Sequence, residues 1–388
     1  MIHAPVSSKI PTNPNENLIG VPGSRHSIHT PALVLDLDIL ESNIRKMAAF
    51  ANCRLEKLRP HAKTHKSAKI AQMQIDAGAV GVCCAKLGEA ETLAALGIDG
   101  ILITSPIVTA EKIERLLDLN DQMDELLIVV DNIQVGKRLV EYVARRARPL
   151  QVLVDMGAGG NRTGAATPQA AAQIAAYLQG HANVEMRGLQ VYAGYLQHIE
   201  NYNARVTAAE IERTRIKTAM SEFRAIGASL DIVAGSGTGT FDLDAGEEVF
   251  SELQVGSYVF MDTEYNRVNK PTSSSSGFQT SLFVQSCVIS ANVAGKATVD
   301  AGFKAFSTDG PKPVVVGGAP TSSGFAFMGD EHGCVLLPDG ATPLRVGDIV
   351  TFETPHCDPT VNLYDTYCCV RGNDLVDIWP VDTRGKTW

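Results

Sequence analysis

Three ionisable side chains alternate along one short segment near the start of the chain. Arg59, His61 and Lys63 occupy every second position of the run Lys57–Lys63 (KLRPHAK). Side chains alternate across a β-strand, so these three would share one face. Such groups are costly inside a closed sheet unless they are paired or used in chemistry. A partly desolvated Lys63 beside Arg59 would have a lowered pKa, which favours an imine-forming amine. A solvated loop lysine is the alternative.

A glycine-rich run, GSGTGT at residues 235–240, follows an apolar stretch. Glycines let backbone N–H groups approach an anion closely. In a barrel of eight strands, the loops after strands seven and eight form the usual phosphate site. We therefore predict a phosphate cradle built from Ser236, Gly237, Thr238 and Gly239, completed by Gly256, Ser257 and Tyr258. A flexible turn is the alternative.

An imidazole and a carboxylate lie two residues apart in the segment Pro355–Pro359 (PHCDP). In an extended segment His356 and Asp358 would point the same way, and Cys357 the opposite way. Such a pair can hold a divalent cation, with water or substrate filling the open positions. A nitrogen and oxygen donor set suits Mn, Mg, Co or Zn. A surface hydrogen-bonded pair is the alternative.

Further pocket candidates follow two other apolar runs. The glycine-rich loop Gly157–Gly164 carries Arg162, which could hold an anionic or phenolate oxygen over a barrel mouth. Gln190 and Tyr192 would share one face of a strand, and His198 follows shortly after. Structural roles for these residues remain open.

The elements that would position these residues alternate between strand and helix. An initial strand, Ala32–Leu37, is not counted among the strands of the barrel. Eight further runs follow, with amphipathic helical stretches between them, and this alternation predicts a parallel sheet with helices outside. Eight β-α units favour a closed (β/α)8 TIM-type barrel, whose active sites lie at the C-terminal ends of the strands. The expected strands are Lys57–Lys63, Val80–Cys84, Gly100–Thr104, Leu126–Val130, Pro149–Asp155, Glu185–Tyr192, Asp231–Ala234 and Gln254–Phe260.

The pattern changes after Asn266. A polar linker, Asn269–Gly277 (NKPTSSSSG), is followed by short strands and turns, which predict a second, all-β domain. The expected strands of this domain are Leu282–Ser290, Lys296–Asp300, Pro313–Val316, Gly333–Leu337, Ile349–Glu353, Thr366–Val370 and Leu375–Trp379. We expect an N-terminal arm and strand (residues 1–37) that join the β domain, a barrel (38–268), and a C-terminal β domain (269–388) carrying the metal site.

Composition limits the classes of protein. The 388 residues carry a net charge of −9, which argues against a nucleic-acid partner. Residues 1–20 lack the apolar core of a signal peptide, and no run is apolar enough to cross a membrane. The eight cysteines form no CxxC pair, which favours reduced thiols and a cytoplasmic protein.

Taken together, the motifs resemble the D-threonine aldolase group of fold-type III pyridoxal-phosphate enzymes, whose architecture is alanine racemase-like. The resemblance covers about residue 28 to the C-terminus, and its words occur in the family's order. They are TPALVLDLD (Thr30–Asp38), RPHAKTHK (Arg59–Lys66), GVCCAKLGEAE (Gly81–Glu91), QVYAGYLQH (Gln190–His198), GSGTGTF (Gly235–Phe241), ELQVGSYVFMD (Glu252–Asp262), VDAGFK (Val299–Lys304), DEHG (Asp330–Gly333), HCDPTVNLYD (His356–Asp365) and WPVDTRGK (Trp379–Lys386).

The resemblance implies a role for each candidate residue. Lys63 would bind the cofactor pyridoxal 5'-phosphate, and the glycine loop with Ser257 and Tyr258 would hold its phosphate. His356 and Asp358 would hold the activating cation, and His198 or a metal-bound hydroxide would remove the substrate's hydroxyl proton. The remaining cofactor contacts would come from His61, Arg162, Gln190 and Tyr192. A homodimer is also expected.

The implied reaction is retro-aldol cleavage of D-β-hydroxy-α-amino acids, such as D-threonine, to glycine and an aldehyde. 3-Hydroxy-D-aspartate aldolase is the nearest alternative. The related D-serine and 3-hydroxyaspartate dehydratases carry His-x-Cys where this chain has His356 and Asp358, so the aldolase branch is favoured. An amino-acid racemase would leave that pair without a task, and a non-enzymatic pyridoxal-phosphate carrier protein would lack the β domain. One departure is Thr163, where the family word GxGRCG, one residue shorter, has cysteine.

Overall fold

A parallel sheet of eight strands forms one half of the molecule. The computed structural model describes residues 13–54, 56–159, 162–268 and 277–388. The strand order is β2-β9-β8-β7-β6-β5-β4-β3, and a bridge between His61 and Cys83 joins its two edges. This confirms the predicted barrel. Its strands are β2 (Lys57–Leu58), β3 (Val82–Cys84), β4 (Ile101–Ile103), β5 (Leu126–Val130), β6 (Leu150–Asp155), β7 (Val184–Val191), β8 (Ile232–Gly235) and β9 (Glu252–Leu253).

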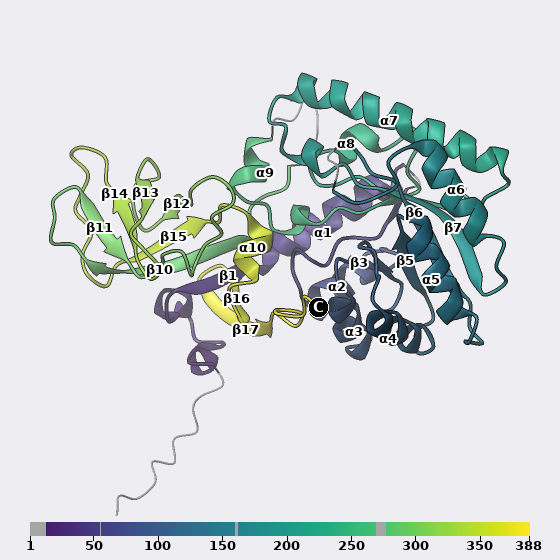
Figure 1. The fold of residues 1–388 in the computed structure, drawn as a ribbon. Helices are drawn as coiled ribbons and strands as arrows, with labels where there is room; N and C mark the ends of the chain where they lie inside the picture. The colour runs from purple at the N-terminus through teal and green to yellow at the C-terminus, as the bar shows by residue number, and fades with distance from the viewer. Residues whose placement is uncertain (1–12, 55, 160–161, 269–276) are drawn as a thin grey trace, which may run out of the picture.

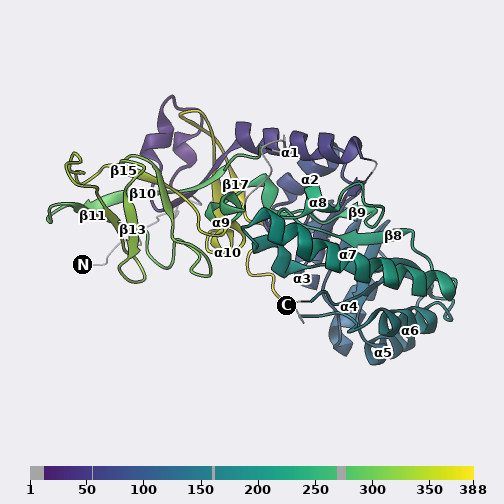
Figure 2. The same ribbon diagram turned by 90° about the horizontal axis from the view of Figure 1, so that it is seen from above.

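Helices lie outside this sheet, as Figures 1 and 2 show. Many begin at a side-chain cap: Asp36, Thr109, Asn132, Thr167 and Asn201 each accept a hydrogen bond from the first helical turn. The helices are α1 (Leu37–Asn52), α2 (Ala68–Asp76), α3 (Leu87–Ala95), α4 (Ala110–Asn120), α5 (Ile133–Val143), α6 (Pro168–Leu178), α7 (Tyr202–Ala225), α8 (Phe241–Asp244), α9 (Thr263–Arg267) and α10 (Cys357–Val361), with short 3-10 turns η1 (Glu16–Leu18), η2 (Ser24–Ser27), η3 (Gly194–His198) and η4 (Ser257–Val259).

Two of the predicted barrel strands depart furthest from the structure. The segment Lys57–Lys63 is a regular strand only at β2, although Arg59 and His61 still donate backbone hydrogen bonds to the β9 side. Pro60 has no N–H to donate, and the chain turns after His61, so Lys63 lies in a turn. The predicted strand Gln254–Phe260 is wrong: the strand ends at Leu253, and η4 follows.

A nine-stranded sheet forms the other half. Its main path is β13-β14-β11-β10-β1-β16-β17, with β15 pairing β10 and β12. The initial strand β1 (Ala32–Asp36) lies inside this sheet, antiparallel to β10 and parallel to β16. The strand β13 (Gly324–Phe327) was not predicted. The others are β10 (Leu282–Ser290), β11 (Lys296–Val299), β12 (Val314–Gly317), β14 (Gly333–Leu336), β15 (Ile349–Glu353), β16 (Thr366–Arg371) and β17 (Asp374–Pro380).

A shared hydrophobic core joins the two halves. One cluster contains Leu40 of α1, Phe260 beside η4, and Phe352 and Tyr367 of the β domain, all at most 1% exposed. The short helices α9 and α10 lie between the halves in both views (Figures 1 and 2). Side chains carried by the two halves are therefore held in a fixed relation. Within the described ranges, no helix is long and apolar enough to cross a membrane.

Candidate active site at the barrel mouth

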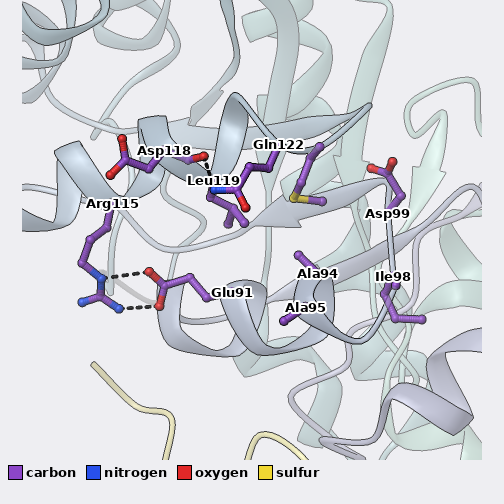
Figure 3. Close-up of a pocket in the computed structure, with 11 residues that line it drawn as sticks. Glu91, Ala94, Ala95, Ile98, Asp99, Arg115, Asp118, Leu119 and Gln122 are labelled. Atoms are coloured by element: carbon purple, nitrogen blue, oxygen red, sulfur yellow. Dashed lines mark hydrogen bonds and ion pairs between the residues drawn. The ribbon is translucent and has the colours of Figure 1, made fainter.

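A cavity of about 400 Å³ lies at the C-terminal ends of the barrel strands and is completed by the β domain. It brings together five predicted residues from distant parts of the chain: Lys63, Arg162, Tyr192, His198 and His356. Its other lining residues are Asp155, Met156, Ala158, Thr163, Gly194, Tyr195 and Tyr265. A larger cavity of about 600 Å³ lies between α3 and α4 and contains none of the predicted residues (Figure 3).

Lys63 reaches the cavity from the turn after β2 and forms an ion pair with Asp358. Burial lowers the pKa of the Lys63 amine, but the Asp358 carboxylate outweighs burial, so the net pKa is raised. The expectation of a lowered Lys63 pKa is therefore wrong. In the same pair, burial raises the pKa of Asp358, but Lys63 and His356 bring it below its usual range.

Arg59 does not act on Lys63 in the way predicted. Its guanidinium is 2% exposed and lies in the barrel interior, where it pairs with Glu252 at 2.7 Å and Glu125 at 3.2 Å. Two carboxylates compensate the buried cation, so Arg59 is a structural charge.

The turn that carries Lys63 is held firmly on its far side. Lys66 adopts a left-handed φ of 51° and pairs with Glu89, while its carbonyl accepts from the Thr383 N–H. The Tyr367 hydroxyl donates to the His65 carbonyl. Residues in this conformation cluster where structure is over-determined around a site. The contacts from Tyr367 and Thr383 therefore anchor the backbone of the turn that carries Lys63.

His61 and Gln190 lie among the predicted residues but do not line the cavity. The His61 Nε2 lies 3.1 Å from the Thr104 hydroxyl, and burial, aided by Lys63, lowers the pKa of His61. Gln190 donates to Asp155 at 3.1 Å. Burial raises the pKa of Asp155 despite these contacts. Gln190 thus contacts the lining residue Asp155, and the His61 Nδ1 accepts from the N–H of the lining residue Lys63 at 3.3 Å.

Arg162 lies over the Tyr192 ring, with its guanidinium carbon 5.3 Å from the ring centre. The neighbouring Thr163 donates to Asp155 at 2.9 Å, which ties this loop to the end of β6. Thr163, which stands where the resembled family has a cysteine, thus donates a hydrogen bond to the Asp155 carboxylate. Gly160 and Asn161 lie outside the described residues.

The two predicted phosphate loops meet beside the cavity. The Tyr258 N–H donates to the Thr238 hydroxyl at 3.0 Å, which joins the loop after β8 to η4. Ser236, rather than a glycine, has the left-handed φ of 65°. The Ser257 hydroxyl donates to Asp358 at 3.3 Å, whereas the Tyr258 hydroxyl accepts from Gln74 and points away from these loops. Both polar groups of Tyr258 therefore have partners within the protein, the N–H on Thr238 and the hydroxyl on Gln74.

The segment around His356 and Asp358 is not extended throughout, which corrects the prediction. His356 is the N-cap of α10, and Asp358 lies in its first turn, where Pro359 is tolerated. Cys357 is fully buried, and its N–H donates to Asp262 at 2.7 Å. His356 and Asp358 still lie at the same edge of the site, because the helix turns Asp358 toward Lys63.

Three acidic or aromatic residues that contact the two histidines were missed by the sequence reasoning. Glu264 lies 2.9 Å from His198, and Asp309 lies 2.9 Å from His356. Tyr265 packs with its ring centre 5.6 Å from that of His198. Asp262 is the N-cap of α9, and as a typical N-cap residue it could have indicated the short helix that carries Glu264 and Tyr265. In the described part of the chain, no group of three or more His, Cys, Asp or Glu side chains is arranged to hold a metal ion.

Comparisons with known proteins give the family. Residues 35–264 match the family described as alanine racemase, N-terminal domain, and residues 281–370 match the putative serine dehydratase domain. The chain is 35% identical to 3-hydroxy-D-aspartate aldolase of Paracoccus denitrificans (strain Pd 1222), over 94% of this chain and 95% of the relative. It is 34% identical to D-threonine aldolase of Arthrobacter sp, over 92% and 93%. The crystal structure of D-threonine aldolase from Filomicrobium marinum superposes with a TM-score of 0.90 at 36% identity, over 94% and 98%.

Proposed function

Because this chain belongs to the alanine racemase-like, fold-type III family of pyridoxal-phosphate proteins, we propose that it cleaves D-β-hydroxy-α-amino acids by a retro-aldol reaction that requires a divalent cation. Its relatives named as aldolases make it a carbon–carbon lyase. The proposed products from D-threonine are glycine and acetaldehyde. 3-Hydroxy-D-aspartate, which would yield glycine and glyoxylate, is the second candidate substrate. A relative that is 35% identical to this chain is named 3-hydroxy-D-aspartate aldolase.

One observation carries the proposal. The Lys63 amine, from the barrel, and the His356–Asp358 pair, from the β domain, meet at one cavity that His198 also lines. A racemase or a simple cofactor carrier needs no such pair beside the lysine. A cation held there by His356 and Asp358 would supply positive charge that favours ionisation of the substrate hydroxyl.

The residues present fit pyridoxal phosphate. Lys63 supplies an amine in the cavity, and the loops joined by the hydrogen bond from Tyr258 to Thr238 would hold the phosphate. A Cβ added at Gly239 would lie 2.5 Å from the Gln197 carbonyl oxygen, and one added at Gly256 would lie 2.6 Å from the Thr64 hydroxyl. Only glycine fits at these positions. When bound, the cofactor supplies an electron sink for the pair released when the Cα–Cβ bond breaks.

Gly239→Ala tests this cradle. The new methyl group would collide with backbone atoms of Gln197, at 2.5 Å from its oxygen and 2.8 Å from its Cα, and these cannot rotate away. Overpacking of this kind costs about 1–3 kcal/mol. We expect a lower melting temperature and weaker binding of pyridoxal phosphate, measured by calorimetry and by fluorescence titration. Gly277→Ala, whose Cβ would meet nothing within 4 Å, is the matched control. Equal cofactor affinity in both variants would contradict the cradle.

The chain's own groups would divide the remaining work. The Lys63 amine would bind the cofactor and hold it at the barrel mouth. Arg162 and Tyr192 would orient it, since both line the cavity. His356 and Asp358 would hold the cation, whose charge favours loss of the hydroxyl proton. His198 would accept that proton.

Four further properties belong to the same proposal. We propose that the cation is Mn, Mg, Co or Zn, because the donor set is nitrogen and oxygen. We propose a homodimer in the cytoplasm. We also propose the division into an N-terminal arm (1–37), a cofactor-binding barrel (38–268) and a β domain (269–388).

A substrate panel tests the function. D-Threonine, D-phenylserine and 3-hydroxy-D-aspartate are each incubated with the loaded protein, with added Mn or with chelator, and the released aldehyde is measured. We expect aldehyde and glycine with Mn and their loss in chelator. Formation of 2-oxobutanoate from D-threonine would favour a dehydratase, and racemisation without cleavage would favour a racemase.

A further inference from the structure

A carboxylate that the proposed reaction does not yet use lies against the two histidines of the site. Glu264 Oε1 is 2.9 Å from the His198 Nδ1, and its Oε2 is 3.9 Å from the His356 Nδ1. His356 has a nearer partner, since its Nδ1 lies 2.9 Å from Asp309. Each imidazole therefore faces its own carboxylate through Nδ1.

The chemistry of these contacts fixes the position of a proton. A carboxylate only accepts hydrogen bonds, so the ring nitrogen facing it must carry the hydrogen. A neutral His198 held in this way has its lone pair on Nε2, which is the nitrogen left to take a proton from substrate. The same argument leaves the Nε2 of His356 free to bind a cation, as in carboxylate–histidine–metal arrangements.

The backbone holds Glu264 in place relative to both rings. Its N–H donates to the Pro355 carbonyl at 3.2 Å, directly before His356. The N-cap Asp262 is fully buried and accepts from the N–H groups of Tyr265 and Cys357. The start of α9 and the start of α10 are thus tied to the same carboxylate.

Resting on the proposed aldolase function, we propose that Glu264 is the positioning residue for His198 and that Asp309 is the positioning residue for His356. Glu264 holds His198 with its proton on Nδ1 and its Nε2 available to the substrate. Asp309 holds His356 with its proton on Nδ1, so that the Nε2 of His356 is available to the cation. The two carboxylates therefore act on different steps, the first on proton removal and the second on metal binding.

The test uses two variants that keep shape and remove charge. Glu264→Gln is expected to lower kcat at saturating Mn by about 10- to 100-fold, with substrate KM and the Mn Kd changed by less than about threefold. Asp309→Asn is expected to raise the Mn Kd, measured by equilibrium dialysis without substrate, by about 10-fold or more, and saturating Mn should restore most of its kcat.

A control and the contrary outcomes complete the design. Asn266→Ala removes another α9 contact, a 2.9 Å hydrogen bond to Thr280, and should leave kcat and the Mn Kd as in the wild type. The proposal is overturned if Glu264→Gln keeps the wild-type kcat, or if both charge variants change kcat and Mn Kd together. A wild type that releases no aldehyde would instead refute the proposed function itself.

Discussion

Lys63→Ala is expected to abolish aldehyde release, with a loss of at least about a thousandfold in kcat/KM. Of the lysines near the site, Lys63 alone among those described lines the cavity. Lys66 is 7% exposed and paired with Glu89, and Lys69 is paired with Asp377. Neither can replace it without breaking a structural contact.

Two measurements check this result. The visible absorbance of bound cofactor should disappear in Lys63→Ala, and single-turnover cleavage of D-threonine should be lost. Lys69→Ala is the matched control, because that side chain is 55% exposed and lies outside the cavity. Lys63→Ala also leaves the Asp358 carboxylate without the Lys63 ammonium group with which it pairs, so we expect a lower melting temperature for that variant. Persistent absorbance in Lys63→Ala would assign the cofactor to another lysine.

Asp358→Ala has the second large expected effect. The proposed cation would lose one of its two protein ligands, so we expect at least about a 100-fold weaker Mn affinity and a comparable loss of turnover. The cofactor should still bind, because Lys63 and the glycine loops are unchanged. Mn binding is measured by equilibrium dialysis, turnover by released aldehyde, and cofactor binding by visible absorbance.

Its control is a carboxylate of the same half of the molecule. Asp365→Ala removes an exposed side chain paired with Arg384, and it should behave as the wild type. Metal-dependent turnover that survives in Asp358→Ala would assign the cation to other residues. Turnover lost together with the cofactor absorbance would mean that Asp358 acts mainly through its ion pair with Lys63.

Much of the fold could be predicted because strands and helices leave local patterns in the sequence. The apolar run Leu126–Val130 became β5 with the same bounds, and Leu282–Ser290 became β10. Predictions failed where the chain bends. Residues 254–260 are apolar enough for a strand, but η4 begins directly after Gly256 and takes the place of that strand. The segment after His356 forms the helix α10. This helix was not predicted, because five residues are too few to show a helical periodicity in the sequence.

The sequence alone determined the residue types, their order and the two-part architecture, because spacing and motif words are local properties. Only the tertiary structure decided which charges meet. It placed Arg59 against Glu252 and Asp358 against Lys63, which reversed the expected direction of the Lys63 pKa. It also brought Glu264 and Asp309 to the two histidines. Lys63 and Asp358 are 295 positions apart, and no local pattern specifies a contact over that separation.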